Sequence, residues 1–207
     1  MKPRRLAVVA AGLSQPSSSR MLAERLAQAT KAATEDLGGE MEVEVIELRD
    51  HAHELTNNLL TGFADQNLRR AMDTVVEADG LIAVSPIFSA SYTGLFKTFF
   101  DVLESDSLAG KPVLIGATAG TARHSLALEH AIRPLFIYLR AVVVPTAVFA
   151  ATEDWGSGAS AADRALSERI DRAGRELASL VASTDARRPN PYEDITPFEQ
   201  MLGGRSD

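Results

Sequence analysis

Four serines and an arginine stand close together near the start of the chain, where an apolar run gives way to a helical pattern. The segment reads GLSQPSSSR over residues 12–20. Serine hydroxyls and the unpaired backbone N–H groups of a helix start bind anions, and an arginine adds charge and a forked set of donors. Serine is also a common N-terminal helix cap. The segment therefore predicts a phosphate site or a plain cap, and its place at a strand end favours the phosphate site.

This loop differs from other phosphate-binding loops. It matches neither GxxxxGK[ST], the pattern that holds nucleoside triphosphates, nor GxGxxG, the pattern that holds dinucleotides. It is also not the G-x-S-x-G turn of serine hydrolases, because Pro16 stands where the second glycine belongs. The sequence contains no cysteine, which excludes disulfides, thiolate metal sites and a cysteine nucleophile.

Two further polar loops follow later apolar runs, and they read SPIFSASYTGLFK and TAGTARH. In the first, residues 86–88 would line an apolar slot for a flat tricyclic ring. In the second, the small pair Ala119–Gly120 would let backbone amides approach the polar edge of that ring. Each loop alone is equally well explained as a turn capped by its threonine, Thr93 or Thr121. Three such loops at neighbouring strand ends favour a site for a ring that carries a phosphate.

Other chemically capable residues give weaker signals. His51 and His53 lie two residues apart in the sequence HAHE, without further placed ligands, so we expect a solvent-facing polar loop and no metal site. His124 would contact a phosphate or cap a helix. Trp155 follows the last apolar run, where we expect it to pack against the protein.

The elements that must position these loops follow from the hydrophobic pattern. Short, β-branched apolar runs alternate with longer segments of helical spacing, which predicts repeated βαβ units and an α/β fold. The expected strands are Leu6–Ala10, Met41–Leu48, Leu81–Ser85, Pro112–Thr118 and Ala141–Ala150. The expected helices are Ser18–Asp36, Gln66–Ala78, Thr93–Glu104, Arg123–Leu139 and Ser160–Ser183.

The strand patterns also indicate a topology. The run Met41–Leu48 alternates polar and apolar residues like an edge strand, whereas the first, third and fourth runs are continuously apolar, like strands covered on both faces. With right-handed crossovers, this favours a flavodoxin-like, doubly wound, five-stranded parallel sheet of order 2-1-3-4-5. The ligand crevice of such a sheet lies beyond the carboxyl ends of its first, third and fourth strands.

Length and composition limit the remaining possibilities. The 207 residues, 45% of them hydrophobic, suit one domain over residues 1–184, followed by a polar, proline-containing tail over 185–207. A net charge of −7 argues against a broad nucleic-acid surface, which needs clustered Lys and Arg. No apolar stretch reaches the length of a membrane span, and the lack of cysteine fits a cytoplasmic protein.

The stretches SPxFxxxYTGxxK and HxxAxxxAxxP, which begin at Ser85 and His124, resemble the NAD(P)H-dependent FMN reductases that partner two-component flavin monooxygenases. The resemblance covers about residues 5–155. It implies a flavodoxin-like fold, FMN as cofactor or substrate, a reduced nicotinamide as reductant, and a homodimer or homotetramer. It also implies a flavin-dependent monooxygenase as the partner that accepts the reduced flavin.

The resemblance carries FMN-binding roles to three sets of residues, although Leu13 and Gln15 depart from the usual G-S-x-R start of the phosphate loop. The phosphate would be held by Ser14, Ser17, Ser19 and Arg20, with Gln15 beside them, where the usual pattern has an arginine. The face of the ring would lie on Pro86, Ile87, Phe88 and Ala90, and its polar edge on Thr118, Ala119, Gly120 and Thr121.

Pro134 stands inside an expected helix, where it cannot donate to the carbonyl of His130, so we expect a kink or a π-bulge there. In similar two-component reductases a π-bulge in this helix lies at a subunit interface beside the flavin. The resemblance therefore implies that His130 bears on flavin exchange or assembly. A helix kinked for packing alone is the other explanation.

No catalytic triad is recognisable, which fits hydride transfer from NAD(P)H to N5 of FMN by alignment rather than by an acid or nucleophile. Three other functions stay open at this point. The chain would be a quinone or azo-compound reductase that retains its FMN, a non-enzymatic flavin-binding electron carrier, or a phosphate-binding interaction domain without flavin.

Overall fold

The computed structural model describes residues 2–155 and 161–184. The strands are β1 Arg4–Ala10, β2 Met41–Glu47, β3 Gly80–Phe88, β4 Ser91–Tyr92, β5 Pro112–Ala119, β6 Val142–Val143 and β7 Val148–Ala151. The α-helices are α1 Ser18–Asp36, α2 Ala52–Thr61, α3 Gln66–Glu77, α4 Gly94–Asp101, α5 Arg133–Tyr138 and α6 Ala161–Ser183. Shorter helices are η1 Leu48–His51, η2 Ala122–His124, η3 Leu128–Ile132 and η4 Thr152–Trp155. The expected tail, residues 185–207, and the expected helix start at Ser160 lie outside the described residues.

The sheet confirms the predicted α/β topology. Its order is β2-β1-β3-β5-β6, with β7 also paired to β5, and all of these pairs are parallel. The expected fifth strand, Ala141–Ala150, is split into β6 and β7, with Pro145 between them. Proline has no N–H to give to a sheet, which accounts for the interruption. The short strand β4 adds an antiparallel hairpin to the end of β3.

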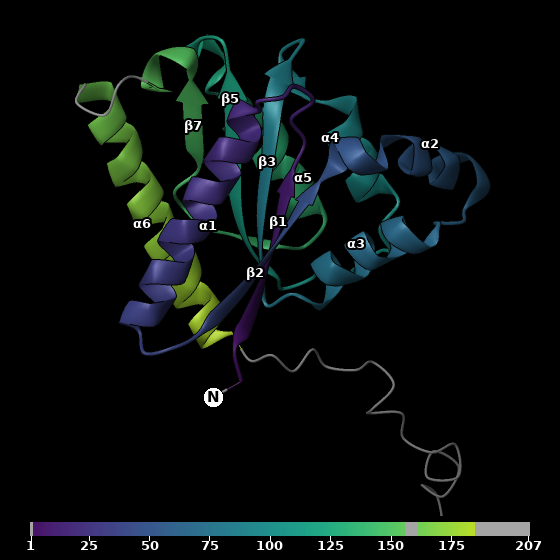
Figure 1. Cartoon of the computed structure of the whole chain (residues 1–207), viewed down its shortest axis with the longest axis horizontal. Helices are drawn as coiled ribbons and strands as arrows, with labels where there is room; N and C mark the ends of the chain where they lie inside the picture. The colour runs from purple at the N-terminus through teal and green to yellow at the C-terminus, as the bar shows by residue number, and fades with distance from the viewer. Residues whose placement is uncertain (1, 156–160, 185–207) are drawn as a thin grey trace, which may run out of the picture.

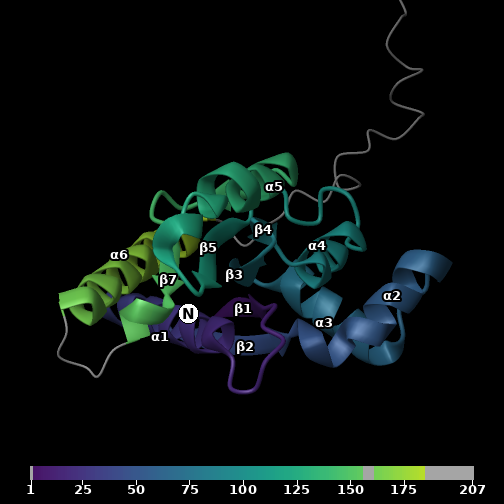
Figure 2. The ribbon, with the colours of Figure 1, turned by 90° about the horizontal axis from the view of Figure 1, so that it is seen from above.

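Helices cover both faces of the sheet, as Figures 1 and 2 show. The side chains of β1 alternate between the faces, so that Leu6 and Val8 pack with α1 and α6, whereas Ala7 and Val9 pack with α3, α4 and α5. The helices α1 and α6 approach so closely that a Cβ on Gly174 would lie 2.8 Å from the carbonyl carbon of Ala29. The sheet is therefore a core buried on both sides, as its continuously apolar strands predict.

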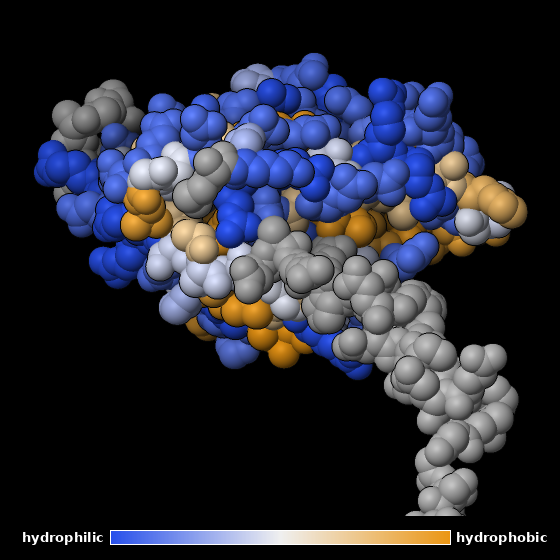
Figure 3. All heavy atoms as spheres, turned by 90° about the horizontal axis from the view of Figure 1, so that it is seen from below, coloured by the Kyte–Doolittle hydropathy of each residue, from blue (hydrophilic) through white to orange (hydrophobic). Residues whose placement is uncertain are grey.

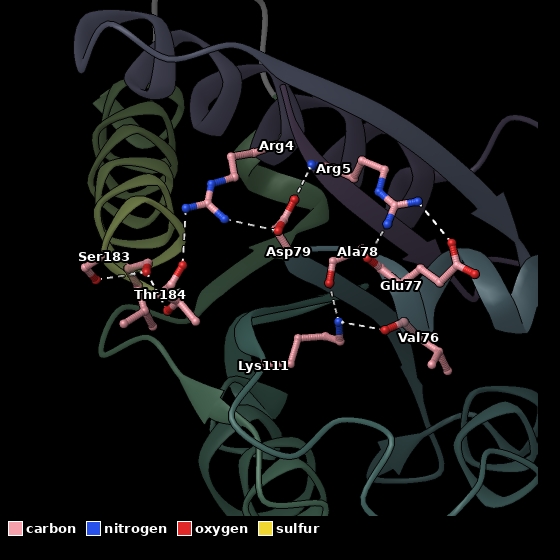
Figure 4. Close-up of polar contacts among 10 residues, drawn as sticks. Arg4, Arg5, Val76, Glu77, Ala78, Asp79, Lys111, Ser183 and Thr184 are labelled. Carbon is pink, nitrogen blue, oxygen red and sulfur yellow. Dashed lines mark hydrogen bonds and ion pairs between the residues drawn. The ribbon is translucent and has the colours of Figure 1, made fainter. Parts of the chain in front are cut away.

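The amino-terminal edge of the sheet is fastened by polar contacts (Figure 4). Nη1 of Arg4 donates to Asp79 Oδ1 at 3.2 Å, and its Nη2 donates to the carbonyl of Thr184 at the end of α6 at 3.2 Å. The buried Lys111 donates from Nζ to the carbonyls of Val76, at 3.3 Å, and Ala78. A cation at these last carbonyls of α3 satisfies the helix end and complements its dipole. These contacts join β1, α3, α6 and the start of β5 at the edge of the sheet opposite the strands' carboxyl ends.

The predicted polar loop at residues 51–54 is wrong. Residues 48–51 form η1 and the chain continues directly into α2, in which Leu55 is fully buried and which ends at Gly62 with φ 77°. Burial of Leu55 against the core stabilises a helix that the two histidines do not suggest. The far end of α2 exposes Leu59, Leu60 and Phe63. Figure 3 shows hydrophobic surface at this end of the molecule.

The expected helix Arg123–Leu139 is interrupted. The 3₁₀ turn η2, the π-helix η3 and the α-helix α5 divide this segment, and η3 ends two residues before Pro134. This confirms the predicted π-bulge, because the missing N–H of Pro134 leaves the helix free to widen before it. None of the described helices is long and apolar enough to cross a membrane.

Candidate functional site

The loops predicted to bind a ligand meet at the carboxyl edge of the sheet. Register places Ala10 beside Val84, Pro86 beside Thr118, and Thr118 beside Ala150. The ends of β1, β3, β5 and β7 are therefore neighbours, at the upper edge of the sheet in Figure 1. The β1–α1 loop, the β3–β4 hairpin and the turn after β5 all leave from this edge.

Gly12 lets the β1–α1 loop fold tightly. A Cβ at this buried position would lie 1.9 Å from Ser17 Oγ, so the loop closes only without a side chain here. Ser17 is the N-cap of α1, and its Oγ accepts a hydrogen bond from the N–H of Arg20 at 3.2 Å. The cap predicted for this loop is therefore present. It holds the start of α1, where unpaired N–H groups gather, at the strand edge.

Two of the predicted residue sets touch. The hydroxyls of Ser19, in the first turn of α1, and Thr118, at the end of β5, are 2.7 Å apart and both side chains are buried. This bond joins the phosphate loop to the β5 loop across 99 positions of sequence. Ser14, between Leu13 and Gln15, is exposed to solvent, as are both of these neighbours.

Arg20 is paired with carboxylates in this structure. Its Nε donates to Glu24 Oε1 at 2.8 Å, and its Nη1 forms an ion pair with Glu47 at the end of β2. The hydrogen bond to Glu24, followed by that to Glu47, raises the pKa of the guanidinium. The structure thus places the predicted arginine beside the loop, with two of its donors already engaged.

A second arginine, which sequence reasoning missed, lies against the same loop. With the Gln15 amide oriented so that donors meet acceptors, its oxygen accepts hydrogen bonds from Nη2 and Nη1 of Arg49, at 2.7 and 3.1 Å. Arg49 also faces Asp50, at 3.4 Å. A usable signal was present, because Arg49 lies two residues after β2 and the end of β2 lies beside the end of β1.

The residues predicted to line the ring face lie on the β3–β4 hairpin, some of them buried and the others exposed. Pro86 and Ile87 are buried within β3, whereas Phe88 is half-exposed at its tip. The turn residues Ser89 and Ala90 have φ values of 30° and 68°. Two left-handed residues make a tight two-residue hairpin, and outside glycine this backbone is strained. Strain of this kind is characteristic of functional sites.

The turn after β5 changes from buried to exposed within three residues. Thr118 is buried, Ala119 is partly buried, and Gly120 is exposed, so that a Cβ added there would meet no atom within 4 Å. Thr121 caps η2 by accepting from the N–H of Arg123 at 3.4 Å, as Thr93 caps α4 by accepting from the N–H of Phe96 at 3.2 Å. The predicted threonine caps are confirmed, and Gly120 lies exposed at the edge between β5 and η2.

The remaining sequence candidates lie around this edge or away from it. His130 is exposed on η3 and lines a groove of about 460 Å³ with Tyr92, Lys97 and Tyr138. The hydrogen bond from Lys97 to Asp101 raises the pKa of the lysine. Trp155 packs beneath the guanidinium of Arg25, 5.8 Å from the ring centre, as expected. Among the described residues, no cluster of three side chains suited to a metal ion occurs.

The chain is similar to known proteins along the segment that carries these loops. The sequence model of the family described as NADPH-dependent FMN reductase matches residues 4–156. An FMN reductase (NADPH) of Pseudomonas aeruginosa is 36% identical over 155 residues, which span 74% of this chain and 80% of that protein. The NADH-dependent FMN reductase SfnE of Pseudomonas putida is 31% identical over 188 residues, or 90% of this chain and 97% of that protein.

Solved structures of oxidoreductases have the same fold as this chain. An oxidoreductase from Corynebacterium diphtheriae superposes with a TM-score of 0.85 at 46% identity, covering 89% of this chain and 100% of that one. An NADH:FMN oxidoreductase in its apo form superposes with a TM-score of 0.73 at 27% identity, covering 92% of this chain and 99% of that one.

The family match runs from β1 to η4 and includes each loop at the carboxyl edge of the sheet. It confirms the resemblance carried by the SPxFxxxYTGxxK and HxxAxxxAxxP stretches. Identities of 36% and 31% over most of the length of two relatives support the same assignment. The chain belongs to the NADPH-dependent FMN reductase family, as an oxidoreductase with FMN as cofactor and a reduced nicotinamide as reductant.

Proposed function

We propose that this enzyme passes a hydride from NADH or NADPH to FMN at the carboxyl edge of the sheet and releases the reduced flavin to a flavin-dependent monooxygenase. The observation that carries the site is the 2.7 Å bond between Ser19 and Thr118. It ties the hydroxyl-rich loop to the turn after β5, so that one ligand can meet both. The supply of a monooxygenase rests on the resemblance to reductases of two-component systems.

The β1–α1 loop fits a phosphate. It offers hydroxyls, the N–H groups of the first turn of α1, and guanidinium groups beside it, and the lack of a Cβ on Gly12 lets Ser17 pack against the end of β1. We assign the phosphate to Ser14, Gln15, Ser17, Ser19 and Arg20.

The neighbouring loops fit a flat ring. The hairpin places Phe88 and Ala90 at the edge, next to the buried Pro86 and Ile87. The exposed backbone at Gly120, directly after β5, would offer an N–H donor to a polar ring edge, where negative charge gathers on reduction. We assign the ring face to the four hairpin residues, and the polar edge to Thr118, Ala119, Gly120 and Thr121.

Bound FMN supplies the redox chemistry, because its ring accepts a hydride at N5 from a nicotinamide. The protein itself therefore contributes binding and alignment. The hairpin and the turn after β5 would hold the FMN ring, and the apolar side chains of the hairpin would limit the access of water. Such a reaction needs no general acid and no nucleophile.

We also propose that the enzyme is a homodimer or homotetramer and works in the cytoplasm, where reduced nicotinamide is formed. Exposed apolar side chains on and beside η3 and α5 support assembly, namely Leu126, Ile137 and Tyr138. A subunit contact there would bring His130 near a neighbouring flavin site. Light scattering after gel filtration tests the assembly, and a monomeric mass would contradict it. In Tyr138→Asp, the fraction of protein that elutes as the oligomer should fall.

One set of assays tests the proposed reaction. Purified protein is titrated with FMN by quenching of flavin fluorescence, and oxidation of NADH and of NADPH is followed by absorbance with and without free FMN. We expect oxidation that rises with added FMN. No FMN-dependent oxidation of either nicotinamide would refute the reductase reaction. FMN retained through gel filtration would instead favour a quinone or azo-compound reductase.

A further inference from the structure

We propose that Glu47 is a positioning residue that acts through Arg20 to weaken binding of the FMN phosphate, and so keeps the flavin exchangeable. The inference rests on the proposed function, because it assigns the phosphate to the β1–α1 loop. It adds a residue outside that loop, on the edge strand β2, whose carboxylate competes with the phosphate for one guanidinium.

The sheet brings Glu47 to the loop. Parallel pairing of β1 and β2 sets Glu47 directly beside Ala10, two residues before Gly12. Arg20 lies in the first turn of α1, so its side chain reaches back to the end of β2 and pairs with Glu47. The two residues are 27 positions apart in sequence, and the sheet register makes them neighbours.

The Glu47 contact differs from the other carboxylate contact of Arg20. The side chain of Glu47 is 18% exposed, whereas that of Glu24 is 49% exposed. Solvent screens an exposed carboxylate strongly and a shielded one less, so the Glu47 contact is the less screened of the two. The two carboxylates and one guanidinium together leave a net negative charge beside the loop.

A phosphate monoester carries a charge of about −1.5 to −2 near neutral pH. It therefore meets a negative cluster in which the arginine's charge is already compensated. Binding must draw Arg20 away from Glu47 or leave it shared, and either course reduces the affinity. The hydroxyls and N–H groups of the loop still bind the phosphate, but without the full contribution of a free arginine. This favours release of the flavin after each turnover.

The polar contact between Gln15 and Arg49 fixes the same side of the loop. Arg49 is the second residue of η1, two positions after Glu47, and its guanidinium donates to the Gln15 amide oxygen. Asp50 offsets part of its charge at 3.4 Å. The end of β2 and the start of η1 therefore hold the loop at two points, of which the Glu47 contact is the one that engages the cationic phosphate ligand, Arg20.

The test compares Glu47→Gln with Glu24→Gln as the matched control. Both variants remove one carboxylate from Arg20 and keep the shape of the side chain. Dissociation constants for FMN and for riboflavin, which lacks the phosphate, are measured by fluorescence quenching at low and high salt. We expect Glu47→Gln to tighten FMN binding by roughly three- to tenfold at low salt and Glu24→Gln by less than about twofold. Riboflavin binding should not change.

The salt series and one further variant test whether Glu47 acts by charge and through Arg20. High salt should shrink the gain in Glu47→Gln, because the effect is electrostatic. In an Arg20→Met background, Glu47→Gln should tighten FMN binding less than it does in the wild-type background, since the competition for the guanidinium is gone and only direct charge repulsion is left. Thermal unfolding of each variant confirms that it is folded before titration.

The outcomes separate this inference from the function on which it rests. Unchanged or weaker FMN binding in Glu47→Gln, an equal gain for riboflavin, or a gain of undiminished size in the Arg20→Met background would each overturn the role of Glu47. In all of these cases the wild-type enzyme still binds and reduces FMN. Wild-type protein that binds no FMN at all would overturn the proposed function, and this inference with it.

Discussion

Replacing Gly12 by alanine tests whether the β1–α1 loop depends on the close approach seen in the structure. The new Cβ would lie 1.9 Å from Ser17 Oγ, a distance at which the loop has to move. Moving the hydroxyl breaks the N-cap of α1, which costs about 1 kcal/mol, and the overlap itself costs about 1–3 kcal/mol. We therefore expect Gly12→Ala to lower the free energy of unfolding by about 2–4 kcal/mol.

The second variant, Ser17→Ala, identifies the cause. Alone it removes the cap and should cost about 1 kcal/mol. In the double variant the clashing atom is absent, and the nearest neighbours of the new Cβ are the Cβ atoms of residue 17, at 3.1 Å, and Ser19, at 3.3 Å. Small shifts relieve such contacts, so the double variant should be no less stable than Gly12→Ala alone. The summed costs of the single variants should exceed the cost of the double variant by about 1–3 kcal/mol.

Urea unfolding gives the free energies, and an FMN titration gives a second measure of the loop. Gly120→Ala is the matched control at the same edge, because a Cβ there meets no atom within 4 Å. Its stability should change by less than about 0.5 kcal/mol. Additive costs for Gly12→Ala and Ser17→Ala would refute the reasoning, since the predicted clash requires the Ser17 hydroxyl. Wild-type stability of Gly12→Ala would refute it as well.

Three further predictions concern other parts of the fold. Lys111→Met removes a buried cation from the carbonyls at the end of α3 and should cost about 2–4 kcal/mol in urea unfolding, and a loss below about 0.5 kcal/mol would contradict this role. Ser19→Ala should cost about 1–3 kcal/mol, because it leaves the buried Thr118 hydroxyl unpaired, and adding Thr118→Val should restore part of the loss. If the second substitution only adds to the cost, the bond is not the cause. The hydrogen bond from Arg133 lowers the pKa of Glu129, so this pair stabilises the fold above the carboxyl's unfolded pKa and ceases to do so as pH falls through the folded value. Since Glu129 is half-exposed, Glu129→Gln should remove under about 1 kcal/mol of stability at neutral pH and flatten the decline of stability at acid pH; an unchanged pH profile would argue against the pair.

Much of the candidate site could be predicted from local sequence. The run of serines before a helix indicates a cap and an anion site together, and Ser17 indeed caps α1. The threonines at 93 and 121 cap the next two loops for the same local reason, the need of a helix start for acceptors. The π-helix before Pro134 was predictable too, because a missing N–H acts on the residues immediately before it.

The partners of the charged residues could not be predicted in this way. Arg20 looked free for a phosphate, but the register of β2 against β1 places Glu47 beside it. The residues around Arg49 do not indicate its partner, and the usable signal lay in the pairing of β2 with β1, which brings Arg49 to Gln15. The helix α2 was missed because burial of Leu55 depends on a core that other elements form.

The sequence by itself determined the layered sheet of this reductase, since the alternation of apolar runs with helical periods is a local property that constrains strand order and crossover. It also placed three polar loops at one edge, because parallel strands end together. The tertiary structure alone decided which groups at that edge are already paired. Charges act through space across many residues of sequence, so the state of Arg20 depends on register and burial that no short segment contains.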